Sequence, residues 1–104
     1  MMNVIRNNLK FEYLYRDAGN YKQFGQIVFL NPTNLDPQSA TLKIKDKLID
    51  GEFFYPSKVG VPRLEAYDFD FEIDHEWYEF QKFSLTNENP TELINAEKFI
   101  SKFS

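Results

Sequence analysis

The segment that decides the fold is residues 9–30, LKFEYLYRDAGNYKQFGQIVFL. Over its first seven residues apolar side chains occupy every second position, with charged side chains at two of the three positions between them, as in a strand with one buried face and one exposed face. The apolar positions are Leu9, Phe11, Tyr13 and Tyr15, and the outward positions include Lys10, Glu12 and Arg16. Residues 17–20 are turn formers, and residues 24–30 return to β-forming sequence. The segment therefore predicts an antiparallel hairpin, with Gly25 as a candidate β-bulge.

Two proline signals predict helices. Asp36–Pro37 and Asn89–Pro90 each place an N-cap residue before a proline at the first helical position. The first helix should run to about Ile49 and stop at Gly51. Helical spacing gives the expected buried stripes. They are Ala40, Ile44 and Leu48 for the first helix, and Leu93, Ala96, Ile100 and Phe103, with Phe99 alongside, for the second.

The remaining segments complete a mixed fold. Residues 53–55 predict a short strand, and residues 56–64, with their prolines and Gly60, predict an irregular loop that we expect to be mobile. Residues 77–85 carry apolar side chains on both parities, which is typical of a strand at the centre of a sheet. We therefore expect one α+β domain over residues 1–104. Its architecture should be a two-layer sandwich, a mainly antiparallel sheet of three to four strands with two helices on one face, in the order β-β-α-β-β-α.

Composition limits the chemistry that the chain can perform. With 104 residues, 17% of them aromatic, it can bury a core of its own. The absence of cysteine excludes disulfides and thiolate sites. The N-terminal residues lack the apolar stretch of a signal peptide and no segment approaches membrane-spanning length, so we expect a cytoplasmic protein without a membrane partner.

Negative charge is concentrated in residues 65–79. This segment holds seven acids and no lysine or arginine, whereas the whole chain has a net charge of −4. Carboxylates alternate there with rings, which in an extended backbone would place acids and aromatic side chains on opposite faces. The candidate partner-binding residues are Tyr67, Asp68, Asp70, Glu72, Asp74, Glu76 and Trp77. The acids also match EF-hand ligand positions, but Ile73 occupies the position that requires glycine, which excludes that motif.

Three further stretches carry a family resemblance. They are residues 15–22 (YRDAGNYK), 48–54 (LIDGEFF) and 74–80 (DHEWYEF). Together they resemble a group of small uncharacterised bacterial proteins of unknown function, and the similarity covers most of the chain. It implies an independently folding bacterial domain and brings no activity, cofactor or partner.

Two functional hypotheses follow. The leading one is a non-enzymatic interaction protein, of the inhibitor, immunity or adaptor type, whose acidic-aromatic surface binds a basic protein partner. This hypothesis includes no catalytic residue, metal or cofactor, and it expects no nucleic acid to bind the acidic face. It is compatible with either a monomer or a homodimer. The alternative is a divalent-metal-dependent hydrolase or small-ligand-binding domain that uses the acidic cluster and the single histidine, His75.

Overall fold

The structure is a computed structural model that describes residues 7–64 and 76–103. In chain order its elements are β1 (Asn8–Arg16), β2 (Lys22–Phe29), α1 (Pro37–Lys45), β3 (Phe53–Phe54), α2 (Pro56–Val59), β4 (Tyr78–Thr86) and α3 (Ala96–Ile100). The strands form one curled antiparallel sheet in the order β2-β1-β4-β3. The α+β class and the mainly antiparallel sheet are thus confirmed. The described residues contain three short helices in place of the two that the sequence predicted.

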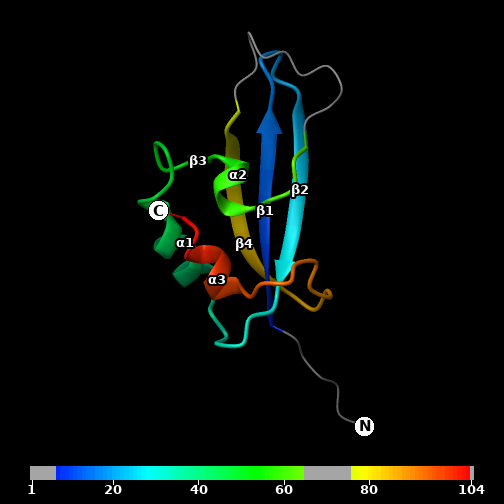
Figure 1. Cartoon of the computed structure of the whole chain (residues 1–104), viewed down its shortest axis with the longest axis vertical. Helices are drawn as coiled ribbons and strands as arrows, with labels where there is room; N and C mark the ends of the chain where they lie inside the picture. The colour runs from blue at the N-terminus through cyan, green and yellow to red at the C-terminus, as the bar shows by residue number, and fades with distance from the viewer. Residues whose placement is uncertain (1–6, 65–75, 104) are drawn as a thin grey trace.

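β1 lies in the interior of the sheet, between β2 and β4 (Figure 1). The predicted hairpin with β2 is confirmed, and its turn is closed by Asp17. The Asn20 N–H donates to the Asp17 carbonyl over 2.9 Å, and the Tyr21 N–H donates to Asp17 Oδ1 over 3.0 Å. Asn20 has a φ of 66°, a left-handed conformation that asparagine tolerates better than most residues. The turn chemistry read from the sequence therefore operates as expected.

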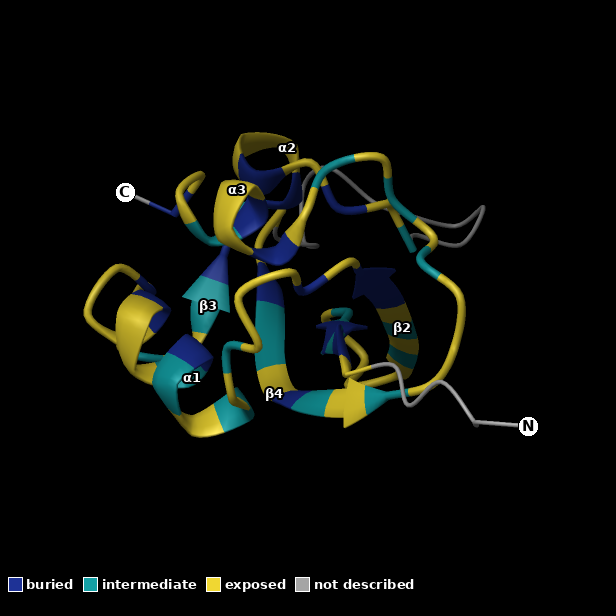
Figure 2. Cartoon of the chain, turned by 90° about the horizontal axis from the view of Figure 1, so that it is seen from below, coloured by how far each residue is buried: buried dark blue, intermediate teal, exposed yellow. Residues whose placement is uncertain are grey.

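One face of β1 forms the floor of the hydrophobic core. Leu9, Phe11, Tyr13 and Tyr15 are each at most 2% exposed, as the alternation predicted. The Phe11 ring centroid lies between 4.9 and 6.1 Å from those of Tyr13, Phe54, Phe80, Phe83, Phe99 and Phe103. All three helices contribute to this core, with Ala40 and Ile44 from α1, Val59 from α2, and Ala96 and Phe99 from α3. In Figure 2 the buried parts of these helices turn toward the sheet.

The predicted bulge at Gly25 is absent. Tyr13 and Gly25 pair directly in an unbroken β1–β2 register. The glycine is needed for a different reason, because a Cβ at this position would lie 2.6 Å from Cζ of the Tyr13 ring. The irregularity lies instead between β1 and β4, where Glu12 pairs with Lys82 and Tyr13 with Phe80, so that β4 contains one extra residue.

This bulge corrects the interpretation of β4. The strand lies between β1 and β3, in the interior position that the sequence predicted. Its aromatic residues at even and odd positions, Phe80 and Phe83, nevertheless do not lie on opposite faces of the sheet. Because the extra residue changes the alternation, Phe80 and Phe83 both approach Phe11, with centroid distances of 5.5 and 5.3 Å. The aromatic residues on either side of the bulge therefore serve the same core.

α1 begins as predicted and ends early. Asp36 caps it, since the Ser39 N–H donates to Asp36 Oδ1 over 2.8 Å. The helix stops at Lys45, and the Lys47 N–H donates to the Ile44 carbonyl over 2.8 Å. A tight turn follows, in which the Ile49 N–H donates to the Phe53 carbonyl over 2.8 Å. Asp50 and Gly51 occupy this turn with φ values of 53° and 71°. Gly51 therefore serves the turn before β3 and does not terminate the helix.

Residues 56–64 are more ordered than the predicted irregular loop. They include α2, and Val59 and Val61 are 3% and 6% exposed. The Tyr13 hydroxyl donates to the Pro62 carbonyl over 3.0 Å, which ties this segment to β1. Burial, with smaller contributions from the Tyr78 and Glu92 charges, raises the pKa of Tyr13 to about 12. The segment therefore packs on the core.

The last helix also starts later than predicted. Its N-cap is Asn95, whose Oδ1 accepts from the Lys98 N–H over 2.9 Å. The residues after Asn89–Pro90 bond to β2 instead of forming helix. The Thr91 N–H donates to the Val28 carbonyl over 2.9 Å, and the Val28 N–H donates to Thr91 Oγ1 over 2.9 Å. Leu93 is consequently fully exposed, whereas Phe99 and Phe103 are buried as predicted.

The face of β1 opposite the core carries charged pairs. They join Lys10 to Glu88, Arg16 to Glu79 and Lys82 to Glu12. The charged positions of the hairpin alternation are thus confirmed as outward-facing. Among the described residues, no helix combines the length and the apolar character that crossing a membrane requires.

Candidate functional site

The structure describes two of the predicted partner-binding residues, Glu76 and Trp77. The other five, Tyr67, Asp68, Asp70, Glu72 and Asp74, lie outside the described residues, and so does His75 of the alternative hypothesis. Glu76 is exposed, and Trp77 is 37% exposed immediately before β4. The candidate site is therefore built outward from Trp77, at the point where the acidic segment joins the fold.

The sheet register brings Trp77 next to the 48–53 turn. Phe53 pairs with Glu79 of β4 on one side and with Ile49 on the other. Directly paired residues project to the same face of a sheet, and Trp77 has the same parity as Glu79. Phe54, one residue on, turns inward and is 4% exposed. The result is a group of apolar side chains on the face opposite the core.

These side chains border a depression that we name the Trp77 hollow, lined by Ile49, Asp50, Phe53, Tyr55 and Trp77. Its volume is about 290 Å³. The Phe53 and Trp77 rings meet edge to face, with centroids 6.5 Å apart. Ile49 is 44% exposed, so the hollow presents apolar surface to solvent. An apolar side chain of another molecule could occupy it.

One carboxylate lines this hollow, and two more are close to its residues in the chain. Asp50 lines the hollow directly. Glu52 is an exposed acid of the same turn, and Glu76 is an exposed acid that directly precedes Trp77 in the chain. Asp50 is also a conformational requirement of the turn, since its φ is 53° and aspartate tolerates that region. The arrangement around Trp77 combines rings with a carboxylate.

Glu79, the last acid of the 65–79 segment, has an internal role. Its Oε2 accepts from Arg16 Nε over 2.8 Å, and its Oε1 accepts from Arg16 Nη2 over 3.3 Å. Arg16 Nη1 also donates to Asn20 Oδ1 over 2.8 Å. The hydrogen bond to Glu79 raises the pKa of the Arg16 guanidinium. This forked pair fixes the start of β4 to the end of β1 and so positions Trp77, two residues earlier.

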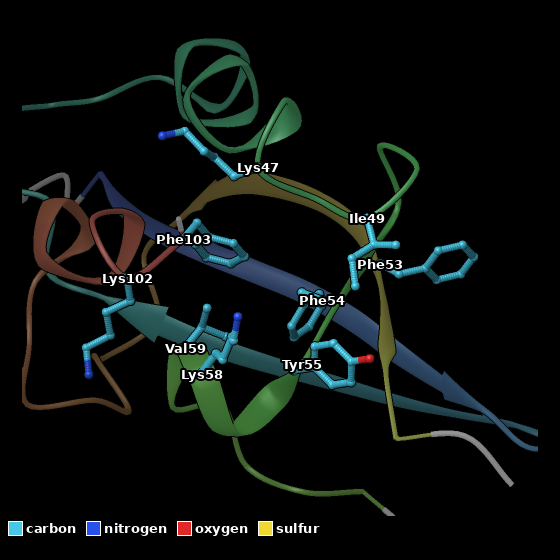
Figure 3. Close-up of a pocket in the computed structure, with 9 residues that line it drawn as sticks. All are labelled: Lys47, Ile49, Phe53, Phe54, Tyr55, Lys58, Val59, Lys102 and Phe103. Carbon is cyan, nitrogen blue, oxygen red and sulfur yellow. The ribbon is translucent and has the colours of Figure 1, made fainter.

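A second depression lies beside the first and has the opposite charge. We name it the lysine hollow: Lys47, Lys58 and Lys102 surround it, and the buried side chains of Phe54, Val59 and Phe103 form its floor. It shares Ile49, Phe53 and Tyr55 with the Trp77 hollow, and its volume is about 90 Å³. Figure 3 shows the Phe103 ring among the three lysine side chains.

Sequence reasoning missed the lysine hollow. A first helix running to about Ile49 would have included Lys47, whereas α1 ends at Lys45 and Lys47 belongs to the following turn. Lys58 and Lys102 come from α2 and from the residues after α3. No spacing in the sequence indicates that these three lysines meet, because their proximity depends on how the helices pack.

Comparison with known proteins found no matching family model, no matching curated protein and no matching solved structure. Over residues 7–64 and 76–103, no three histidine, cysteine, aspartate or glutamate side chains lie together as they would in a metal site. The metal-dependent alternative concerns the acids at 68–74 and His75, which are outside this part of the chain, and it stays a prediction.

Proposed function

We propose that this protein is an interaction module that binds a basic protein partner through the Trp77 hollow and the acidic segment beside it in the sequence. The observation that carries the proposal is the position of Trp77. The partly exposed Trp77 ring lines an apolar hollow. In the sequence, Trp77 directly follows the most acidic stretch of the chain. Apolar anchors with charged surroundings are the usual composition of a protein interface.

The hollow would supply the anchoring contact. Energetic hot spots in interfaces are enriched in tryptophan and tyrosine and form where a side chain fills a partner's pocket. A volume of about 290 Å³ is large enough for one apolar side chain of the partner. Contact with Ile49 and Trp77 would remove from water two of the larger exposed apolar residues of this protein.

The acids would select and orient the partner. Asp50 lines the hollow, and Glu76 is the exposed acid next to Trp77 in the chain. Residues 65–74 add five more acids in the sequence. Complementary charge raises the association rate and rejects acidic competitors more than it raises affinity. The proposal therefore specifies a partner with lysine or arginine around an exposed apolar side chain, bound more weakly at high ionic strength.

The test is affinity capture from the lysate of the organism that encodes the chain, with full-length baits compared by quantitative mass spectrometry. Two baits alter the site, Trp77→Ala and the charge reversal Glu76→Lys. Two matched controls make similar changes elsewhere, Leu93→Ala at a fully exposed leucine and Asp46→Lys at an exposed acid after α1. A partner should be captured by the wild type and both controls and depleted from both site variants.

The captured protein is then purified for a direct measurement. Trp77→Ala should raise its Kd by about 30-fold or more, as expected for a hot-spot tryptophan. Reversing Asp70, Glu72 and Asp74 to lysine together should abolish binding while the circular dichroism spectrum stays native. Equal capture by wild type and both site variants, or unchanged affinity after the triple reversal, would exclude this surface as the interface.

A further inference from the structure

We infer that the lysine hollow is a binding site for a small organic anion, a phosphate or carboxylate group attached to an apolar or aromatic moiety. The inference does not rest on the proposed protein interaction, because it uses different polar groups. It rests on three cations from separate elements placed around one apolar depression.

The positive charge of the hollow is uncompensated in the described part of the chain. No acid lines it, and none of Lys47, Lys58 and Lys102 has an ion pair with a described residue. By contrast, Lys10 and Lys82 on the outer face of the sheet are paired with carboxylates. Three like charges around one depression repel one another, and a bound anion relieves that repulsion.

Lys102 extends from the residues after α3 toward α2, which carries Lys58. Its Nζ lies 3.6 Å from the position that a Cβ on Gly60 would occupy. Lys47 lies on the turn after α1, and its ammonium group is directed away from the Phe103 ring in Figure 3. Lysine stems are flexible, so rotation about their bonds would allow the three ammonium groups to turn toward one ligand.

The size and floor of the hollow define the ligand class. A volume of about 90 Å³ accepts one anionic group and excludes a bulky one. The three lysines line one small depression, whereas a nucleic-acid backbone is followed by an extended basic stripe. The partly exposed Phe53 and Tyr55 at its wall favour a ligand whose remainder is apolar or aromatic and extends past the edge of the hollow.

The experiment is an NMR titration of the ¹⁵N-labelled full chain with four probes: phenyl phosphate, inorganic phosphate, benzoate and phenol. Phenyl phosphate should shift the amides of residues 47–60 and 102–103 saturably, with a Kd of about 1 mM. Inorganic phosphate should bind at least about fivefold more weakly because it lacks the ring. Benzoate tests whether a carboxylate can replace the phosphate, and phenol, which is neutral, should produce no saturable shift at these residues.

Substitutions assign the binding to the lysines. Each of Lys47→Gln, Lys58→Gln and Lys102→Gln should weaken phenyl phosphate binding about threefold, and the triple variant about 30-fold. These side chains are exposed and without ion pairs, so the variants should fold normally. The control Lys45→Gln removes a lysine of α1 that does not line the hollow and should leave the Kd unchanged.

Three results would overturn the inference. One is the absence of saturable shifts with every anion at about 10 mM, well above the expected Kd. Another is a triple variant that binds phenyl phosphate as tightly as the wild type. The third is equal affinity for phenol and phenyl phosphate, which would show that the hollow recognises the ring and not the charge. None of these variants changes Trp77, Asp50 or Glu76, so failure here leaves the proposed protein interaction untouched.

Discussion

The two faces of β1 use different interactions. On the core face, Phe11 and Tyr13 are buried among rings contributed by β3, β4 and the C-terminal segment. On the other face, Lys10 and Arg16 pair with carboxylates close to solvent. Apolar burial contributes far more to stability than exposed ion pairs, which solvent and salt screen. The charged positions of the outer face can therefore change with less effect on folding than the rings of the core, although Leu14 and Val28 on this face are buried. The Trp77 hollow lies on this side of the sheet.

The largest expected effect comes from removing the ring at the centre of the core. Phe11→Ala should destabilise the protein by about 3–5 kcal/mol, because it leaves a cavity surrounded by other rings. Glu12→Ala, at the next position on the outer face, should cost about 1 kcal/mol or less. Urea unfolding of both variants measures the difference. Losses of similar size would contradict the contrast drawn between the two faces.

A smaller effect should follow from enlarging Gly25. Gly25→Ala places a methyl group 2.6 Å from the Tyr13 ring, so the ring or the strand must shift, at about 1–3 kcal/mol. Gly19→Ala is the matched control, because its new methyl would meet its nearest neighbour at 3.4 Å. In a Tyr13→Leu background Gly25→Ala should cost less than it does alone. Thermal unfolding of the four variants decides this, and equal losses for the two glycines would refute the packing argument.

The smallest effect should come from the forked pair on the outer face. Arg16→Gln and Glu79→Gln should each lower stability less than Gly25→Ala does, and the double variant should lose little more than either single one. The coupling should shrink as salt is added, since both side chains retain contact with water. Lys22→Gln, at an exposed lysine of β2, is the control. A coupling that is independent of salt would mean that the pair is more deeply buried in solution.

The hairpin was predictable because its information is local. Alternation over residues 9–15 and the turn at Asp17 each depend on neighbours in the sequence. The N-cap at Asp36 is local for the same reason. The errors arose where distant backbone decided the outcome. Bonds from Thr91 to Val28 replaced the first turn of the predicted C-terminal helix, and the extra residue in β4 can be seen only in its pairing with β1.

The candidate site was predictable in part for the same reason. The acids around residue 70 and the adjacent Trp77 stand out in the sequence. Their neighbours in the Trp77 hollow do not, because Ile49 and Phe53 reach it through a turn whose hydrogen bonds replace a predicted helical end. The lysine hollow had no signal at all, since its charges come from three elements that meet only in the folded chain.

The bonds between Thr91 and Val28 also have a consequence for behaviour at high concentration. A sheet margin with free N–H and C=O groups can recruit strands from other molecules and start aggregation. On the β2 margin, Thr91 forms hydrogen bonds with both the N–H and the C=O of Val28. Ile49 forms hydrogen bonds with both the N–H and the C=O of Phe53 on the β3 margin. A strand from a second molecule would have to displace these bonds to add there. At these two positions the fold resists intermolecular β-pairing. Contacts with another molecule at these two positions would therefore use side chains and not backbone hydrogen bonds.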